Sequence, residues 1–328
     1  MVRPTTRTAG LLAGTAALTL GLAACGSSGP GRADGGADPA AAGTVQVVAS
    51  TDVWASVARA VGGDRVAVTP IIDSPDKDPH EYESTPTDAT AVEKAQLILR
   101  NGGGYDEFMT KLVDASGNKA PIVDAVAVSG LRPAGDEGHG HDEGDHEHEH
   151  GEFNEHVWYS LPTVQKVAQS VAAELGKADP AGAAAYTANA RRFDAGVTQL
   201  TSRAAAVGAA HPGATVAVTE PVPEYLLDTA KLRDVTPPEF SEAVEEGNDP
   251  PAAVLQQTLA MFTAQPKVGA LVLNAQTQSP TTDQVRQAAT QAGVPVVETS
   301  ETLPAGTTDY TAWMGGQIDR LSAALDRR

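Results

Sequence analysis

Apolar and polar positions follow two periods along most of the chain, one typical of buried strands and the other of amphipathic helices. The segment VQVVASTDVWASVARAVGG, which begins at Val45, is an apolar run followed by a helical pattern that ends at a glycine pair. The same pairing then recurs, and it predicts strands at 66–72, 96–100 and 121–126 and helices at 86–95 and 107–115. Strands that alternate with helices indicate βαβ units around a parallel sheet.

Residues 132–155 interrupt this alternation. They contain no Lys or Arg after Arg132 and have too few apolar side chains to bury, so we expect a mobile acidic loop. A helix follows from about Leu161. Asp179 and Pro180 are typical of the cap and first turn of a longer helix that reaches about Val207.

A second set of strands and helices follows that long helix. The pattern predicts strands at 215–218, 270–273 and 295–297 and helices at 251–264, 282–292 and 310–325. We therefore expect an α/β fold in which two parallel-sheet lobes, residues 44–178 and 209–328, flank a linking helix at 179–208.

The first 25 residues have the pattern of an export signal. Two arginines precede an apolar run at 9–22, which leads to Cys25, the one cysteine of the chain. The run is shorter than the roughly 20 residues that span a bilayer, so we expect cleavage. Cys25 resembles the lipidated cysteine of a bacterial lipobox, and residues 26–43 have the composition of a flexible linker. The alternative is an ordinary signal peptide with a chance cysteine.

The charge balance limits the class of partner. A net charge of −19 argues against nucleic acid, whose phosphates require a basic surface, and favours cationic partners. A single cysteine permits neither an intramolecular disulfide nor a thiolate metal site.

Four side chains that bind divalent metals follow predicted strands or lie at lobe edges, where open α/β folds bind ligands. They are His80 in DSPDKDPHEYE, His156 in NEHVWYS, Glu220 in VAVTEPVPEYLL and Glu301 in PVVETSETLPAG. Each alone also fits an ordinary loop or core residue. Strand alternation leaves Glu298 open as an alternative to Glu301, and Asn274 is a weaker candidate.

Two imidazoles and two carboxylates suit Zn²⁺ or Mn²⁺, and the absence of thiolate argues against Cu(I). Four protein ligands would close a tetrahedral zinc site, which favours binding over catalysis. The acidic loop adds five histidines, which we expect to collect metal with low affinity: His139, His141, His146, His148 and His150. This collection should fade as the pH falls through about 6.5, because imidazole binds metal only when deprotonated.

In this order and spacing, DPHEYE, RNGGGYDEFMTKL, NEHVWYS, VTEPVPEYLL and SETLPAG resemble the zinc and manganese substrate-binding proteins of ABC transporters, the ZnuA-like group. The resemblance covers nearly the whole mature chain. It implies two α/β lobes joined by a long rigid helix, with the metal in the interlobe cleft. It also implies His80 and His156 as first-lobe ligands. Glu220 stands where zinc-specific relatives commonly have a third histidine, and Glu301 is the nearest replacement for the family's final aspartate.

The resemblance implies a receptor rather than an enzyme. We expect a monomer, lipid-anchored to the outer face of the cell membrane, that captures Zn²⁺ or Mn²⁺ and delivers it to the membrane permease of an ABC importer. One alternative is a secreted zinc metallohydrolase with Glu220 or Glu301 as base, although the chain lacks an HExxH motif. The other is a metal buffer that works without a permease.

Overall fold

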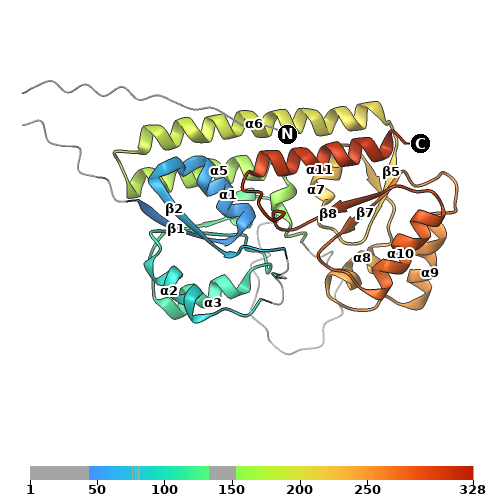
Figure 1. The fold of residues 1–328 in the computed structure, drawn as a ribbon, viewed down its shortest axis with the longest axis horizontal. Helices are drawn as coiled ribbons and strands as arrows, with labels where there is room; N and C mark the ends of the chain where they lie inside the picture. The colour runs from blue at the N-terminus through green and yellow to red at the C-terminus, as the bar shows by residue number, and fades with distance from the viewer. Residues whose placement is uncertain (1–43, 76, 78, 80–81, 133–152, 328) are drawn as a thin grey trace, which may run out of the picture. The chain divides into compact units, whose positions relative to one another are not determined.

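Two four-stranded parallel sheets form the framework of the protein (Figure 1). The computed structural model describes residues 44–327 except 76, 78, 80–81 and 133–152. The first sheet has the order β2-β1-β3-β4, with β1 (Val45–Thr51), β2 (Val66–Ile72), β3 (Leu97–Arg100) and β4 (Ile122–Asp124). The second has the order β6-β5-β7-β8, with β5 (Thr215–Val218), β6 (Arg233–Asp234), β7 (Ala270–Asn274) and β8 (Val296–Thr299). The repeated order confirms the expected two-lobed α/β fold.

Helices connect the strands in both lobes. The first half of the described chain contains α1 (Asp52–Gly62), α2 (Pro86–Lys94), α3 (Glu107–Ser116), α4 (Ala125–Ser129) and the 3₁₀ turns η1 (Gly63–Arg65) and η2 (Val157–Tyr159). Two long helices come next, α5 (Leu161–Ala178) and α6 (Ala183–Ala210). The second half contains α7 (Glu224–Thr229), α8 (Pro238–Glu245), α9 (Ala252–Met261), α10 (Pro280–Gln291) and α11 (Tyr310–Leu325).

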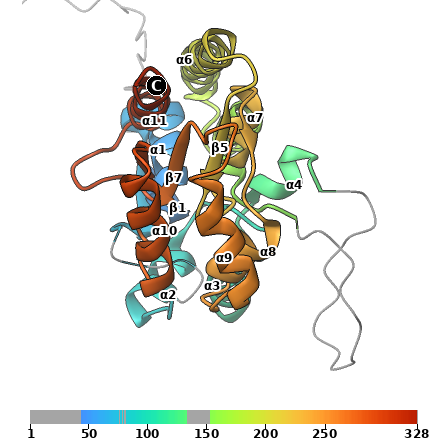
Figure 2. The same cartoon turned by 90° about the vertical axis from the view of Figure 1, so that its right-hand side faces the viewer.

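Helix α6 is the element that both lobes share. It packs against α1 and α5 on one side of the fold and against α7 and α11 on the other. Figures 1 and 2 both show it lying beside α11, along the same edge of the two sheets. Its buried residues recur three or four positions apart, as in Tyr186, Ala190, Phe193, Val197 and Leu200. One hydrophobic cluster continues from β1 through α6 to α11, so the lobes are joined by a common core.

The start of this helix differs from the sequence prediction. Asp179 is the C-cap of α5, and α6 begins only at Ala183. Pro180 disfavours a helical conformation at the residue before it, so α5 cannot continue. The Asp179 carboxylate instead accepts hydrogen bonds of 2.8 Å from Arg65 and from the Tyr186 hydroxyl. The predicted N-terminal cap is therefore wrong.

Short elements account for most of the other differences. The strand predicted to run to residue 126 ends at Asp124, whose side chain accepts a hydrogen bond from the Ala127 N–H and begins α4. Helix α10 begins before residue 282, because Ser279 and Thr282 form a capping box. The pattern did not predict α4, α7, α8 or the two-residue strand β6.

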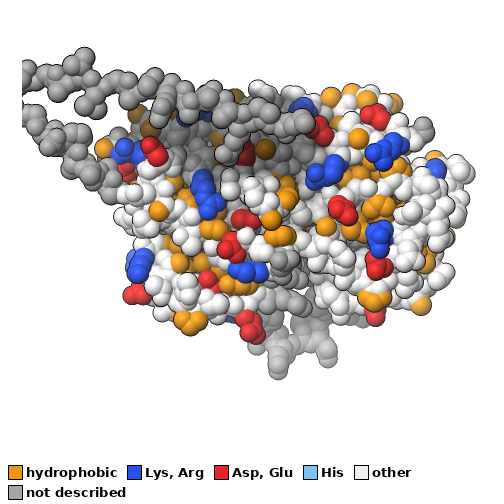
Figure 3. All heavy atoms as spheres, in the orientation of Figure 1, with side chains coloured by type: hydrophobic (Ala, Val, Ile, Leu, Met, Phe, Trp, Pro, Cys, Tyr) orange, Lys and Arg blue, Asp and Glu red, His pale blue; other side chains and the backbone are white. Residues whose placement is uncertain are grey.

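Charged side chains of both signs are interspersed on the face shown in Figure 3 rather than gathered by sign. Within the described ranges, no helix combines the length and the apolar character that crossing a bilayer requires.

Candidate functional site

Polar side chains lie at the ends of the two central strands of the second sheet, β5 and β7. Strand β5 lies between β6 and β7, so the chain leaves β5 and β7 toward opposite sides of the sheet. Ligands bind at such a switch point in open α/β sheets. Glu220 follows β5 by two residues and Asn274 ends β7. Both are buried, with exposed fractions of 3% and 1%.

One amide group joins the two carboxylates that the sequence singled out in this lobe. Nδ2 of Asn274 donates to Oε2 of Glu220 at 2.7 Å and to Oε1 of Glu301 at 2.8 Å. Glu301 lies two residues beyond β8 and is 2% exposed. The Thr277 hydroxyl donates to Oε1 of Glu220, and the Glu301 N–H donates to Oε1 of Gln276 at 2.7 Å. The structure thus brings Glu220 and Glu301 together in one buried polar group.

The alternative residue Glu298 lies elsewhere. It belongs to β8, is exposed, and lines a surface hollow together with Arg286, Arg320 and Arg327. Glu301 comes after the strand has ended, so strand alternation does not determine where its side chain lies. The geometry favours Glu301 over Glu298 as a partner of Glu220.

His156 is joined to this group through an aromatic side chain of the first lobe. It is the N-cap residue of η2 and is 1% exposed. Its ring centroid lies 5.1 Å from that of Trp158 and 6.0 Å from that of Tyr105. The Tyr105 hydroxyl donates to Oε2 of Glu301 at 3.0 Å. Tyr105 therefore contacts Glu301 directly and packs beside His156.

A glycine-rich turn positions Tyr105. The carboxylate of Asp106 accepts hydrogen bonds from the backbone N–H of Asn101 at 2.6 Å and of Gly102 at 2.8 Å. Gly102 has a φ of 79°, and a Cβ at this position would collide with the Asp124 carboxylate. Burial raises the pKa of the Asp106 carboxyl above its ordinary value. Glycine at position 102 is thus required for the tight turn that leads to Tyr105.

Two carboxylates that the sequence did not single out lie beside His156. Oε1 of Glu245, the last residue of α8, is 3.5 Å from Nε2 of His156. One ligand atom each from Glu155, His156 and Glu245 lie within 4.8 Å of one another. Among the described residues, these three form the one group of at least three candidate metal ligands with that spacing. Neither Glu220 nor Glu301 belongs to this group. Both acids occur in polar runs, NEH and AVEEGND, which look like solvated surface in the sequence.

The other predicted residues lie outside the described ranges. They are His80, the lipidation candidate Cys25 and the loop histidines His139, His141, His146, His148 and His150. Of the four predicted ligands, the structure describes His156, Glu220 and Glu301. His211, which the pattern did not assign to the site, lies at the C-cap of α6 with its Nε2 3.1 Å from Asp326.

Comparison with known proteins agrees with the fold. The family model for zinc-uptake complex component A, periplasmic (ZnuA), matches residues 47–324. The manganese-binding lipoprotein MntA of Bacillus subtilis is 29% identical over 188 residues, which cover 56% of this chain and 54% of MntA. The matched region thus spans about half the length of this curated relative.

Solved structures share the fold at low sequence identity. The periplasmic zinc-binding protein TroA from Treponema pallidum is 21% identical, with a TM-score of 0.67 over 86% of this chain and 99% of TroA. The substrate-binding protein FpvC from Pseudomonas aeruginosa, solved in complex with Mn²⁺, is 23% identical, with a TM-score of 0.68 over 86% of this chain and 98% of FpvC. Because the family model covers most of the chain, the protein belongs to the ZnuA family of zinc-uptake complex components.

Proposed function

We propose that this protein is the extracytoplasmic receptor of an ABC importer, which binds Zn²⁺ or Mn²⁺ between its lobes and delivers the ion to a membrane permease. Membership of a zinc-uptake family and the names of the relatives, manganese-binding and metal transporter lipoproteins, support this activity. We propose binding rather than catalysis, so the metal is cargo and not a cofactor.

The observation that carries the proposal is the pair of buried carboxylates at the switch point of the second sheet. Glu220 and Glu301 share a single amide donor from Asn274, and both are at least 97% buried. Two carboxylates buried this close together offer oxygen ligands at one point, and a divalent cation bound there would offset the cost of burying their charges.

We propose that His156, Glu220 and Glu301 bind the ion together with His80. Two nitrogen and two oxygen donors fit a tetrahedral zinc ion, and hard carboxylate oxygens also accept manganese. The donors come from both lobes, so the bound ion favours a closed arrangement of the lobes that a permease can distinguish from the open one.

A metal-bound crystal structure with anomalous scattering from zinc or manganese tests this site. We expect one ion whose nitrogen and oxygen ligands lie at about 2.0–2.2 Å. His156→Ala should abolish tight binding in a competitive chelator titration, while His211→Ala should leave the affinity unchanged. An ion bound outside the interlobe region would disprove the assignment.

We also propose that the receptor is a monomer tethered to the outer face of the cell membrane through lipid on Cys25. The relatives are named lipoproteins, and multiple acyl chains give stable attachment where one gives only marginal binding. Cys25→Ala should move the protein from the membrane fraction to the soluble fraction. A variant that still carries lipid and sediments with membranes would contradict the anchor.

A further inference from the structure

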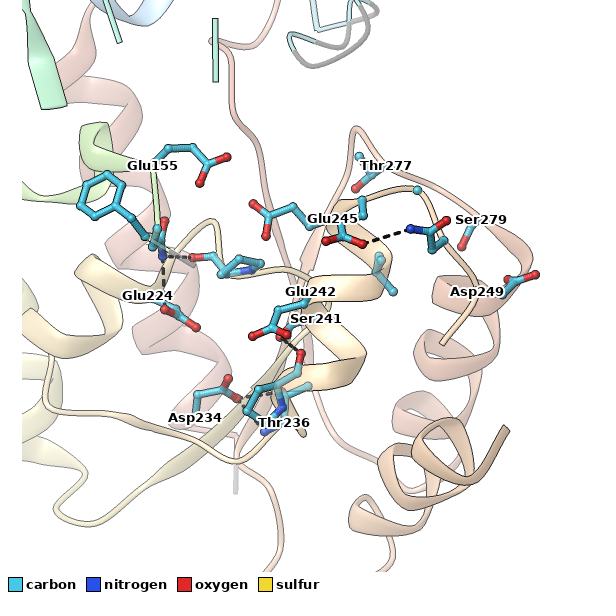
Figure 4. A pocket seen from close by; sticks show the side chains of 18 of the residues that line it. Glu155, Glu224, Asp234, Thr236, Ser241, Glu242, Glu245, Asp249, Thr277 and Ser279 are labelled. Carbon is cyan, nitrogen blue, oxygen red and sulfur yellow. Dashed lines mark hydrogen bonds between the residues drawn. The ribbon is translucent and has the colours of Figure 1, made fainter. Parts of the chain in front are cut away.

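A hollow of about 590 Å³ opens beside Glu155, the residue before His156 (Figure 4). Its walls come from residues 153–155 of the first lobe and from α7, α8 and the segment after β7 in the second. Of the described residues that line it, seven are Asp or Glu and none is Lys or Arg. Figure 4 shows Glu155, Glu242 and Glu245 around the same space. Such a hollow attracts cations, but the charge alone does not make a binding site.

The spacing between His156 and two of the lining carboxylates is more specific. Nε2 of His156 and Oε1 of Glu245 are 3.5 Å apart, and a donor atom of Glu155 lies within 4.8 Å of both. A direct hydrogen bond would bring nitrogen and oxygen to about 2.7–3.2 Å. Two ligands that each lie about 2.0–2.2 Å from one tetrahedral ion are about 3.4 Å apart. The His156–Glu245 separation of 3.5 Å is thus close to the spacing of two ligands of a shared ion.

The orientation of the His156 ring is an independent observation. Nδ2 of Asn154 donates to the backbone oxygen of Pro221 at 2.9 Å and to Glu224 at 3.2 Å, which fixes Oδ1 of Asn154 as an acceptor. That oxygen accepts the backbone N–H of His156 at 3.0 Å and lies 2.9 Å from its Nδ1. Nδ1 therefore carries a proton, and in the neutral imidazole the lone pair is on Nε2, the nitrogen that lies 3.5 Å from Glu245. This is the tautomer that a metal ligand requires.

The hollow also reaches the proposed tight site. Thr277 lines the hollow and donates its hydroxyl hydrogen to Glu220. Glu220 and Glu301 are held together by Asn274, whereas Glu155 and Glu245 form a separate donor group with His156. His156 belongs to this second group and, in the proposed function, to the tight site as well.

We propose that Glu155, His156 and Glu245 form a capture position for a divalent cation, which is occupied before the ion moves to Glu220 and Glu301. This inference rests on the proposed function. Two carboxylates and one imidazole, in a hollow roomy enough for water ligands, suit Zn²⁺ and Mn²⁺. The capture position raises the rate of uptake, while the deeper site determines the equilibrium affinity.

The rate of metal association tests the capture position. Stopped-flow mixing with Zn²⁺ or Mn²⁺ can follow the fluorescence of Trp158, whose ring centroid is 5.1 Å from that of His156. The association rate constant of Glu245→Gln should be about tenfold lower than that of Glu242→Gln. Glu242→Gln is a matched control, because Glu242 lies on the same helix, lines the same hollow and loses the same charge. The equilibrium affinity of both variants should stay within about threefold of the native protein, since an intermediate on the path leaves the end states unchanged.

Equal slowing by Glu245→Gln and Glu242→Gln would show that the hollow acts only through its charge and would overturn the proposal. A loss of affinity in Glu245→Gln as large as that in Glu220→Gln would also overturn it, because Glu245 would then belong to the tight site. In crystals of Glu220→Gln soaked with Zn²⁺, we expect anomalous density at Glu155, His156 and Glu245. If the native protein binds neither metal tightly, the proposed function fails instead.

Discussion

The two lobes have the same strand order but use the ends of their central strands differently. In the first lobe, β1 is followed by Asp52, which accepts the Leu303 N–H at 3.1 and 3.2 Å, and β3 by Asn101. Asn101 accepts the indole N–H of Trp54 at 3.2 Å and donates to the backbone oxygen of Glu155 at 2.9 Å. These side chains bond mainly to backbone groups and neutral partners, so they hold loops in place.

In the second lobe, the equivalent strand ends carry Glu220 and Asn274, and the amide of Asn274 is bonded to two carboxylates. The same topological position therefore serves structure in one lobe and, in our proposal, metal binding in the other. The difference lies in the donor set and not in the fold. In the same proposal, the first lobe contributes His156 from the segment that enters η2, outside its sheet.

Replacement of a carboxylate in the second lobe should have the largest effect. We expect Glu220→Gln to lower the affinity for Zn²⁺ and Mn²⁺ by roughly 100- to 1000-fold, because a buried charged ligand is replaced by a neutral one of the same size. Competition calorimetry against a chelator measures this change.

Glu298→Gln is the matched control, since it removes the same charge from the exposed side of β8. Its affinity should remain within about twofold of the native value, because exposed charges are screened. Equal losses in the two variants would mean that overall charge, and not coordination, governs binding.

The two asparagines sharpen the comparison between lobes. Asn274→Leu should lower the free energy of unfolding of the metal-free protein by about 2–3 kcal/mol, since two buried carboxylates lose their shared donor. Saturating Zn²⁺ should restore part of this loss, because the ion then compensates both charges. Urea unfolding with a chelator and with metal provides the measurement.

Asn101→Leu provides the contrast in the first lobe. It removes hydrogen bonds to Trp54 and to two backbone oxygens, so its destabilisation should be the same with and without metal. If metal rescued the Asn101 variant as well as the Asn274 variant, the functional difference between the two switch points would be disproved.

Much of the fold was predictable from the sequence, because buried parallel strands appear as short apolar runs and the helices between them are amphipathic. His156, Glu220 and Glu301 could be singled out since each follows or precedes a predicted element. Glu301 could not be separated from Glu298 by pattern, because its position depends on the loop after β8 and on the amide of Asn274.

The remaining donors depend on contacts between distant segments. Glu245 comes within 3.5 Å of His156 although 89 positions separate them in the chain, and nothing in the run AVEEGND distinguishes it from a solvated acid. Asp179 looked like a helix cap because capping residues and ion-pair partners are the same residue types, and only the packing of Arg65 and Tyr186 decides between these roles.

Asp52 should give the smallest effect, one that depends on pH. Burial raises the pKa of its carboxyl from 3.8 to about 6, against the lowering effect of hydrogen bonds from the Leu303 and Val53 backbone. Between these two pKa values, the folded protein holds a proton that the unfolded chain has released, so the stability contributed by this group falls as the pH rises from about 4 to 6.

Asp52→Asn keeps an acceptor for the Leu303 N–H but cannot ionise. Thermal unfolding should therefore show the variant more stable than the native protein by about 1–2 kcal/mol at pH 7.5 and little changed at pH 4. Its metal affinity at pH 7.5 should stay within about twofold of the native value, because Asp52 accepts a backbone N–H and is not one of the proposed ligands. A shift in stability that is the same at both pH values would mean that Asp52 acts through packing alone.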